Sequence, residues 1–388
     1  MQTILTLEKA IRENYLPVWQ NQIGIESTPF LDRVKKVPLA GQKIVAAAPI
    51  GMSGNFGFGD EGKATPTSGG MQFEKFVANP KDLYSNICIS VKAVRLGKTP
   101  SAMIDALDTE IRASYEEAKF HQGRALFGNG TGILTTCSAL AAAGTTITVD
   151  SVKNLREGMT IDIYATSAST PQANGAGRRI KTIDRANKTI TLYGADSTFS
   201  AGFITVQNSY NREYTGLGAI FDDNTTSLYG VSKTTNLYLK PVVVNANSDI
   251  NDTLITKALR QAQRDKGSNV DMLLCGDTAF DAYSEYLRTN NYRVEEHFLK
   301  GGFKAIKFLF GNREVDVVNE SFVTDNEIWC VDSSAFELHT DEWDFCDLRG
   351  GGAFNLMEGS SVYRGLLANY GELICKNPGG CVRIYGVA

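Results

Sequence analysis

The stretch GNFGFGDEGKATP, Gly54 to Pro66, combines two patterns found in phosphate-binding loops, G-x-G-x-x-G and G-x-x-x-x-G-K. Such a loop needs a helix directly after it and a Ser or Thr that binds magnesium. Here Ala64 stands where the Ser or Thr is needed, and Pro66 is followed by Thr-Ser-Gly-Gly, which disfavours an immediate helix. Asp60 and Glu61 would also repel phosphate. The stretch is therefore not predicted to bind a nucleotide.

The same stretch is predicted to form the tip of a long, glycine-rich β-hairpin. Residues 43–48 and 71–77 flank it and have strand-like apolar content. About 16 residues in each leg, at about 3.3 Å per residue, would reach roughly 50 Å. An isolated hairpin is marginally stable in water, so we expect this one to lie on another subunit. Its candidate contact residues are Phe56, Phe58, Glu61 and Lys63.

The composition is that of an ordinary globular protein. The 388 residues are 43% hydrophobic and 21% charged, and the formal net charge of −4 disfavours a strongly basic nucleic-acid binder. No uninterrupted apolar run is long enough to span a membrane, and the charged N-terminal residues do not fit a secretory signal. The seven cysteines form no C-x-x-C pair. We expect reduced, mostly buried thiols and neither a metal nor a cofactor.

Catalytic patterns are also missing from the sequence. The three histidines, His121, His297 and His339, lie near no G-x-S-x-G motif, because GMSGN at 51–55 does not have that spacing. The acidic run DEWDFCD at 341–347 alternates acids with aromatic residues, which is typical of a strand with one exposed face. The sequence therefore predicts no enzyme.

The first half of the chain contains an arm and a long helix. An amphipathic helix with Ile4, Leu7, Ile11 and Tyr15 on one face is followed by a poorly periodic segment, which is interpreted as an extended arm. Apolar residues at helical spacing from residue 100 predict one long helix that ends at Gly123 or Gly128.

Residues 145–207 have a different character. Five short segments alternate polar with β-branched or aromatic residues, which predicts five strands of a small closed or nearly closed β-domain. The segment is mildly basic, so a nucleic-acid-binding barrel is the functional alternative. Its aromatic residues are interpreted as too few and too dispersed for a base-stacking face, and a surface insertion is favoured. These residues are Tyr164, Tyr193, Phe199 and Phe203.

Residues 228–334 are predicted to be α/β. Ser248 is expected to cap a helix that ends at Gly267, and residues 272–277 are expected to form a buried strand followed by a second helix. A hairpin is predicted to turn at Gly311-Asn312, and the C-terminal tail is predicted to add two or three strands.

In this order, the parts of the chain resemble the major capsid proteins of tailed bacteriophages, which have the Hong Kong 97 type fold. The hairpin segment resembles the family's E-loop, the long helix resembles its spine helix, and FGNGTGIL at 127–134 is similar to the glycine-rich exit from that helix. The residues that carry the resemblance elsewhere are Glu61-Gly62, Pro66, Phe73, Ile89-Ser90, Gly365, Tyr370-Gly371, Asn377-Pro378 and Arg383.

The resemblance implies an α+β fold class and a division of the chain. The expected parts are an N-terminal arm (1–36), an E-loop (37–80), a peripheral domain with the spine helix (81–144), a β-barrel-like insertion (145–212), an axial α/β domain (213–334), a return to the peripheral domain (335–372) and C-terminal strands (373–388).

The resemblance also implies a function and partners. The expected protein is a structural shell subunit that forms hexamers and pentamers of an icosahedral phage head around double-stranded DNA, which it would contact weakly and without sequence preference. Because no long segment precedes the arm, a separate scaffolding protein is expected, together with a portal protein and an optional decoration protein. The location would be the virion capsid, assembled in the cytoplasm of the bacterial host without a membrane. Some members of the family crosslink a lysine to a neighbour's asparagine with the help of a buried glutamate, roles that Lys63, Asn355 and Glu358 could take.

Two alternatives stay open at this stage. An encapsulin-like cellular nanocompartment would share the fold and would be marked by a pocket that docks cargo peptides. A monomeric carbohydrate- or nucleic-acid-binding module, built on the β-rich segment, would instead stay a single 42.2 kDa particle in sedimentation.

Overall fold

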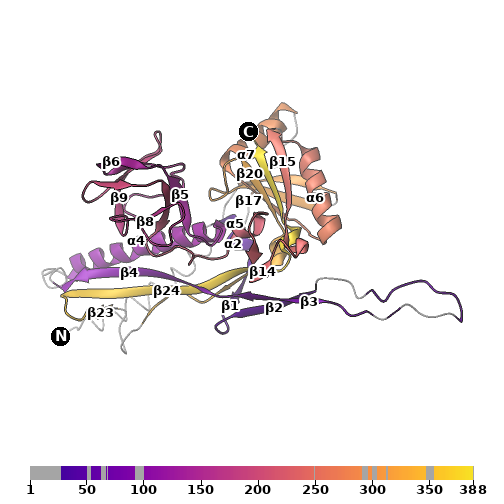
Figure 1. The fold of residues 1–388 in the computed structure, drawn as a ribbon, viewed down its shortest axis with the longest axis horizontal. Helices are drawn as coiled ribbons and strands as arrows, with labels where there is room; N and C mark the ends of the chain where they lie inside the picture. Colours follow the sequence, from indigo (N-terminus) through magenta and orange to yellow (C-terminus); the bar gives the residue numbers. More distant parts are fainter. Residues whose placement is uncertain are drawn as a thin grey trace. The chain divides into compact units, whose positions relative to one another are not determined.

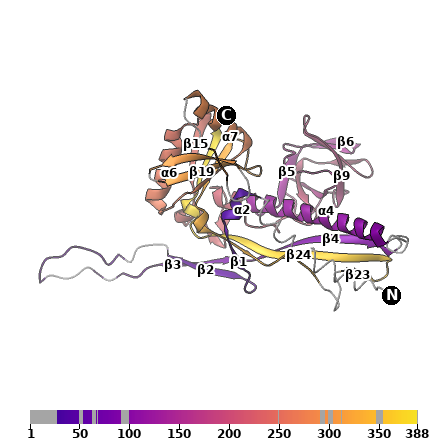
Figure 2. The same cartoon turned by 180° about the vertical axis from the view of Figure 1, so that it is seen from behind.

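A computed structural model of the chain describes residues 28–49, 54–62, 67, 69–91, 100–248, 250–290, 296–298, 304–311, 313–346 and 354–387. The amphipathic helix expected between Ile4 and Tyr15 lies outside these residues. The chain is a mixed α+β protein, as the sequence predicts, and it divides into two compact units. Unit 1 comprises Met1–Pro80, Ile220–Leu356 and Gly365–Ala388, and unit 2 comprises Lys81–Ala219 and Met357–Arg364. Figures 1 and 2 show the elements from opposite sides.

Unit 1 contains a seven-stranded mixed sheet with the strand order β15-β25-β20-β16-β19-β18-β17. β16 is fully buried and pairs in parallel with β19 and antiparallel with β20, so it lies in the middle of the sheet. The predicted buried strand and the predicted hairpin of β18 and β19 are both confirmed. The strand bounds are β15 (Val242–Ser248), β16 (Met272–Cys275), β17 (Glu296–Phe298), β18 (Lys304–Phe310), β19 (Arg313–Asn319), β20 (Glu327–Val331) and β25 (Val382–Val387).

Two helices of unit 1, α6 (Asp252–Lys266) and α7 (Asp277–Thr289), share one hydrophobic core with this sheet. Both helices are confirmed, but the predicted cap at Ser248 is wrong. β15 continues to Ser248, and the extended backbone of Asn251 lets its side chain accept a hydrogen bond from the Leu254 amide at 2.8 Å. At the other end Gly267 adopts the left-handed conformation, with φ of 65°, as the sequence predicts.

A second sheet of unit 1 has the order β1-β21-β24-β22. The segment before it was expected to be extended, but it forms the short helix α2, capped by Thr28 and buried through Phe30, which packs edge-on against Phe336 with ring centroids 5.4 Å apart. In the acidic run, Trp343 and Phe345 are buried and Asp344 is exposed, as expected, although the strand is short. The bounds are α2 (Pro29–Arg33), β1 (Lys35–Pro38), β21 (Phe336–Thr340), β22 (Asp344–Phe345), β23 (Phe354–Leu356) and β24 (Val362–Cys375).

Unit 2 contains the long helix α4, Pro100–Phe127. It ends directly before Gly128, which is one of the two helix ends that the sequence predicts. The strand β4, Lys81–Ser90, precedes it. Ile111, Tyr115 and Ala118 are buried at the spacing that the sequence predicts.

The β-rich part of unit 2 follows α4. The five predicted strands are present, and three more strands were missed, including β5, which pairs with β12 and begins before residue 145. The main sheet has the order β5-β12-β8-β9-β10-β7, and a bridge between Cys137 and Val149 joins its two edges. The bounds are β5 (Ile133–Cys137), β6 (Leu140–Gly144), β7 (Thr146–Thr148), β8 (Thr160–Ala165), β9 (Arg178–Asp184), β10 (Thr189–Leu192), β11 (Ser197–Phe199) and β12 (Gly202–Val206).

The aromatic residues of this β-rich part are less dispersed than expected. Tyr164 and Phe203 stack in parallel with ring centroids 5.1 Å apart, and Tyr210 contacts both rings. The interpretation of dispersed aromatics was wrong for this pair, because Phe203 and Tyr164 are register partners on adjacent strands. Both rings are buried, so they pack the domain and leave little surface on which a base could stack.

The remaining elements are short, and the thiols are all free. Cys88 on β4 is exposed, Cys346 is half-buried and the other five cysteines are buried. Among the described residues, no helix has the length and apolar character needed to cross a bilayer, and no group of three or more potential ligands could hold a metal ion. The short elements are α5 (Leu217–Phe221), β13 (Ser227–Leu228), β14 (Val231–Ser232), η1 (Leu237–Leu239), η2 (Ser333–Ala335) and η3 (Pro378–Gly380).

Candidate self-association surfaces

The predicted hairpin is confirmed. Its strands β2 (Ile44–Pro49) and β3 (Phe73–Ala78) pair antiparallel in continuous register and run side by side in Figures 1 and 2. In the connecting stretch, Gly54 and Gly62 have φ of 66° and 81°, a conformation that other residues rarely adopt. A side chain at either glycine would meet nothing within 4 Å, so backbone conformation and not crowding favours glycine there.

The tip of the hairpin exposes aromatic side chains. Phe56 is 87% exposed and Phe58 is 97% exposed, and their rings meet edge-on at a centroid distance of 5.6 Å. Glu61 is also exposed, while Lys63 lies outside the described residues. Burying a phenylalanine side chain is worth about 1.5–3 kcal/mol. The tip therefore offers a strong apolar contact that the isolated chain leaves in water.

The legs of the hairpin add to this surface. Three further apolar side chains on or next to the strands are about half exposed, which extends the uncovered area away from the tip. They are Val45 (54%), Met71 (49%) and Phe73 (61%). Uncovered apolar area of this kind typically marks an interface with another protein.

The base of the hairpin is anchored in unit 1 through Tyr229. The Val77 amide donates to the Tyr229 carbonyl at 3.0 Å, and the rings of Phe76 and Tyr229 meet edge-on at 6.4 Å. The Tyr229 hydroxyl is buried, donates to the Leu373 carbonyl at 2.9 Å and accepts from the Cys375 amide at 3.1 Å. Burial raises the pKa of this hydroxyl well above its ordinary value, so it stays protonated and keeps its donor role.

Sequence reasoning missed Tyr229. Tyr229 and Gly230 occupy the turn between β13 and β14 with φ of 49° and 81°, the left-handed pair that a tight two-residue hairpin turn requires. Asn-Gly or Asp-Gly usually signals that turn, and Tyr-Gly does not. The glycine was therefore the only local signal for this anchoring residue.

The strand β1, directly before the hairpin, is tied to unit 1 by charges. Lys35 and Lys376 both approach Glu337, with the Nζ atoms 3.4 and 2.7 Å from Oε1. The hydrogen bond from Lys376 is the main cause that lowers the pKa of Glu337 below its ordinary 4.5. The Arg33 guanidinium also pairs with Asp316. The chain is thus tied to unit 1 before the hairpin, at Arg33 and Lys35, and at the end of its second strand, at Val77, while the tip of the hairpin is exposed.

The proposed crosslinking residues are not brought together by any described contact. Asn355 is half-buried on β23, and Glu358 is exposed, whereas the family role requires a buried glutamate. Because Lys63 lies outside the described residues, the crosslink stays a prediction.

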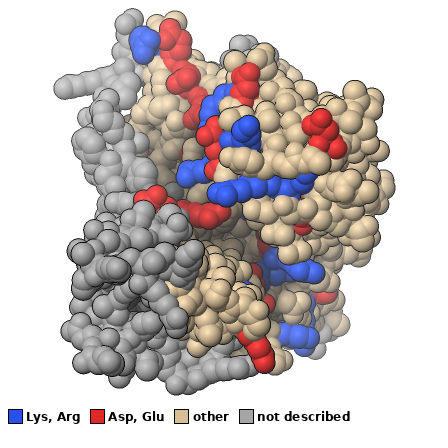
Figure 3. All heavy atoms as spheres, turned by 90° about the vertical axis from the view of Figure 1, so that its left-hand side faces the viewer, with Lys and Arg blue, Asp and Glu red and all other residues tan. Residues whose placement is uncertain are grey.

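Charges on the described surface are mixed in sign. On the face drawn in Figure 3, Lys and Arg side chains lie next to Asp and Glu side chains. Surfaces that bind nucleic acid tightly usually gather positive charge on one face.

Comparison with known proteins gives a likeness in structure only. No protein-family model and no curated protein sequence matches the chain. The capsid protein in the asymmetric unit of cyanophage A-1(L) superposes with a TM-score of 0.54 at 11% identity, over 95% of this chain and 93% of that one.

More distant likenesses include the holo-SrpI encapsulin from Synechococcus elongatus, with a TM-score of 0.48 and 9% identity over 92% of this chain and 87% of that one. The Mycobacterium phage Bobi structure has a TM-score of 0.45 and 11% identity over 93% of this chain and 90% of that one. The cyanophage likeness extends over nearly the full length of both chains and carries the assignment. This chain therefore has the fold of a phage major capsid protein.

Proposed function

We propose that this chain is the major structural subunit of an icosahedral phage head, which assembles from hexamers and pentamers around double-stranded DNA. The observation that carries the proposal is the hairpin β2–β3, anchored through Tyr229 at its base and exposed through Phe56 and Phe58 at its tip. An anchored element with an uncovered apolar end gains stability only when another molecule covers it. In a chain with a capsid-protein fold, that molecule is a second copy.

The elements can be given roles in such a shell. We assign the N-terminal arm to residues 1–36, the E-loop to 37–80, the peripheral domain with its spine helix α4 to 81–144 and 335–372, the β-barrel-like insertion to 145–212, the axial domain to 213–334 and the C-terminal strands to 373–388. The bridge between Cys137 and Val149 supports a nearly closed barrel in the insertion.

Shell assembly suits these features energetically. Each subunit would make several modest contacts, and closed symmetry repeats every contact around the shell. The left-handed glycines of the tip, Gly54 and Gly62, tolerate small changes of direction, which helps one sequence to fit the different neighbour angles of hexamers and pentamers.

The proposed partners follow from the same role. The net charge of −4 suits a wall that encloses DNA without binding it tightly. A scaffolding protein, a portal protein and an optional decoration protein would complete the head, and the mature location would be the virion. The role is structural and not catalytic.

Replacing the tip aromatics tests the proposal. The double variant Phe56→Ser and Phe58→Ser should keep the circular dichroism of the wild type, since neither ring packs on the body of the chain, and should lose most of its shells. Tyr193→Ser is the matched control, because Tyr193 is 53% exposed on the β-rich part and should not affect assembly. Sedimentation and electron microscopy report the outcome. A wild-type protein that remains a 42.2 kDa monomer under all assembly conditions would contradict the proposed function.

A further inference from the structure

The helix α6 presents a basic stripe to solvent. Its buried face, formed by Ile255, Ala258, Leu259 and Ala262, packs into the core of unit 1. Lys257, Arg260 and Arg264 are all exposed and are spaced i, i+3 and i+7, which places them along one side of the helix. Arg264 also contacts the neighbouring Asp265, yet the helix still carries four Lys or Arg against two Asp.

The helix α7 presents an acidic stripe of similar length. Ala279, Tyr283 and Leu287 face the core, while Asp277, Asp281 and Glu285 are exposed and are spaced i, i+4 and i+8. Asp277 accepts a hydrogen bond from Asn319 at 3.0 Å and Glu285 contacts Arg288 at 2.9 Å. The helix carries three acids against one Arg, so its charge balance is opposite to that of α6.

The two helices lie over different parts of one sheet. α6 packs against β15, the edge strand, and against β25, while α7 packs against β25, β20 and β19. The two stripes therefore lie on helices that cover the same sheet but pack over different strands of it. A contact between the basic stripe of one copy and the acidic stripe of another uses two different surfaces, which makes it a head-to-tail contact.

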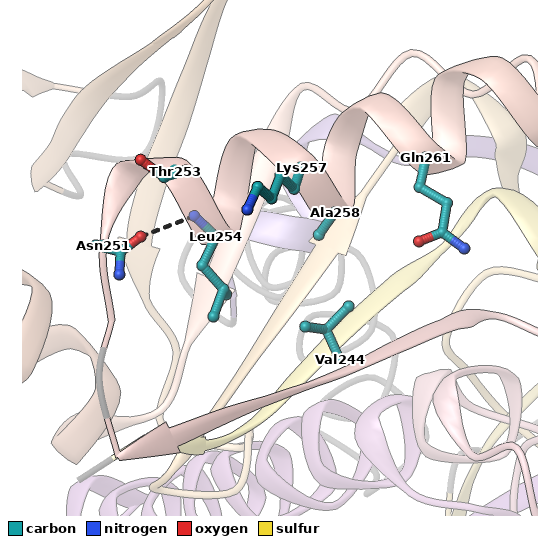
Figure 4. Close-up of a pocket in the computed structure, with 7 residues that line it drawn as sticks. All are labelled: Val244, Asn251, Thr253, Leu254, Lys257, Ala258 and Gln261. Atoms are coloured by element: carbon teal, nitrogen blue, oxygen red, sulfur yellow. Dashed lines mark hydrogen bonds between the residues drawn. The ribbon is translucent and has the colours of Figure 1, made fainter.

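Beside the basic stripe, an open groove of about 600 Å³ leaves room for the side chains of a docking helix. Figure 4 shows Leu254, Ala258 and Gln261 on α6, with Val244 of β15 across from them. Lys257 lines the same groove, so the groove and the stripe are continuous. The groove thus offers apolar and polar contacts next to the positive charges.

We propose that α7 of one copy docks on α6 of the next copy, with the acidic stripe against Lys257, Arg260 and Arg264 and the groove receiving neighbouring side chains of α7. The inference rests on the proposed function, and it names the surface that links subunits within a ring. A head-to-tail contact repeated by rotation closes a ring of five or of six copies with the same residues. Exposed charge pairs tolerate small changes of angle, so one pair of stripes can serve both rings.

Charge reversal on each helix tests the contact. Lys257→Glu with Arg260→Glu makes α6 acidic, and Asp281→Lys with Glu285→Lys makes α7 basic. Each double variant should lose its rings and shells, because like charges then face each other. The quadruple variant has the net charge of the wild type, restores the attraction with the signs exchanged and should regain shells. The control Lys181→Glu with Arg185→Glu makes the same change of charge on the β-rich part, where both residues are exposed, and should assemble normally.

Mixing the two double variants gives a sharper result. In a ring in which the two variants alternate, the acidic α6 of the first variant meets the basic α7 of the second. The unchanged basic α6 of the second variant meets the unchanged acidic α7 of the first. Alternation is complete only in a ring with an even number of copies. An equimolar mixture should therefore recover six-membered rings and not five-membered ones, so closed shells should remain absent while hexamers return. Mass photometry and electron microscopy count the copies in each ring.

A neutral pair of substitutions covers the case in which a reversed helix does not fold. Lys257→Gln with Arg260→Gln keeps helix-forming residues, and its assembly should depend less on salt than that of the wild type. The inference is overturned if wild-type shells form and the folded reversed variants assemble equally well. It is also overturned if the quadruple variant is folded but stays dispersed, or if the neutral variant keeps the salt dependence of the wild type. Absence of wild-type shells would instead count against the proposed function itself.

Discussion

At the scale of residues, Arg124 and Glu213 form a buried ion pair between the end of α4 and the segment after the β-rich part. The side chains are 6% and 8% exposed, with contacts of 2.9 and 2.5 Å between the guanidinium and the carboxylate. Removing one partner leaves the other charge buried, so Arg124→Met should lower the free energy of unfolding by about 3 kcal/mol or more. The double variant Arg124→Met with Glu213→Leu should recover most of this loss in urea denaturation. Arg264→Met, at an exposed pair, should cost less than about 1 kcal/mol. Equal losses of unfolding free energy in Arg124→Met and Arg264→Met would contradict the assignment of Arg124 and Glu213 as a buried ion pair.

A second residue-scale prediction concerns Glu337 and pH. Because its pKa is lowered in the folded state, chiefly by Lys376, the ionised carboxylate stabilises the fold above its ordinary pKa of 4.5. That contribution is lost as the pH falls through the lowered folded-state pKa. Glu337→Gln should therefore be less stable than the wild type at pH 7 and equally stable in strongly acidic buffer. Denaturation curves of unassembled subunits at both pH values provide the measurement. A difference that persists unchanged in acid would mean that the ion pairs with Lys35 and Lys376 are not its cause.

At the scale of elements, the β-rich part should be removable as a unit if the cut follows the hydrogen bonds. The Asn211 amide donates to the Thr131 carbonyl at 2.8 Å, so the two ends of residues 132–210 lie together. Replacing these residues with a short glycine linker should leave a folded subunit. Removing only 146–206 should give far less soluble protein, because β5 loses its partner β12 and exposes Leu134. Soluble yield and circular dichroism of the two deletions make the comparison. Equal yields would show that β5 does not depend on the strands that follow.

The elements also show what the sequence could and could not predict. α6 and α7 were predicted because their apolar residues recur at helical spacing and Gly267 marks an end, whereas the cap moved from Ser248 to Asn251 because β15 is longer than its pattern suggests. β6 was missed because its LAAAG sequence shows no alternation. The parallel pairing of β1 with β21 joins residues 302 positions apart, and no local pattern contains that information. In the candidate surface, the exposed tip was predicted from its glycines, but the anchor at Tyr229 depends on a turn that only the folded chain reveals.

At the scale of the whole molecule, surface charge and apolar exposure have different distributions. The net charge is small, and on the face of Figure 3 positive and negative side chains are interspersed. Exposed large apolar side chains occur on several elements, for example Leu309 (72%) and Leu237 (64%), but Phe56 (87%) and Phe58 (97%) on the hairpin are the two most exposed of the described residues of this kind. In the proposed shell, the uncovered rings would supply an apolar contact between subunits. The separate charged stripes of α6 and α7 would then determine which neighbour is accepted.

The thiol of Cys88 has a practical consequence for work on this molecule. It is the one exposed cysteine of the seven, all of which lie in described parts of the chain, since five are buried and Cys346 is half-buried. A maleimide fluorophore would therefore attach first to β4 of the native subunit without any engineered position. If one batch of subunits carries a donor dye on Cys88 and a second batch carries an acceptor dye there, energy transfer between the dyes would report the incorporation of each new copy in real time.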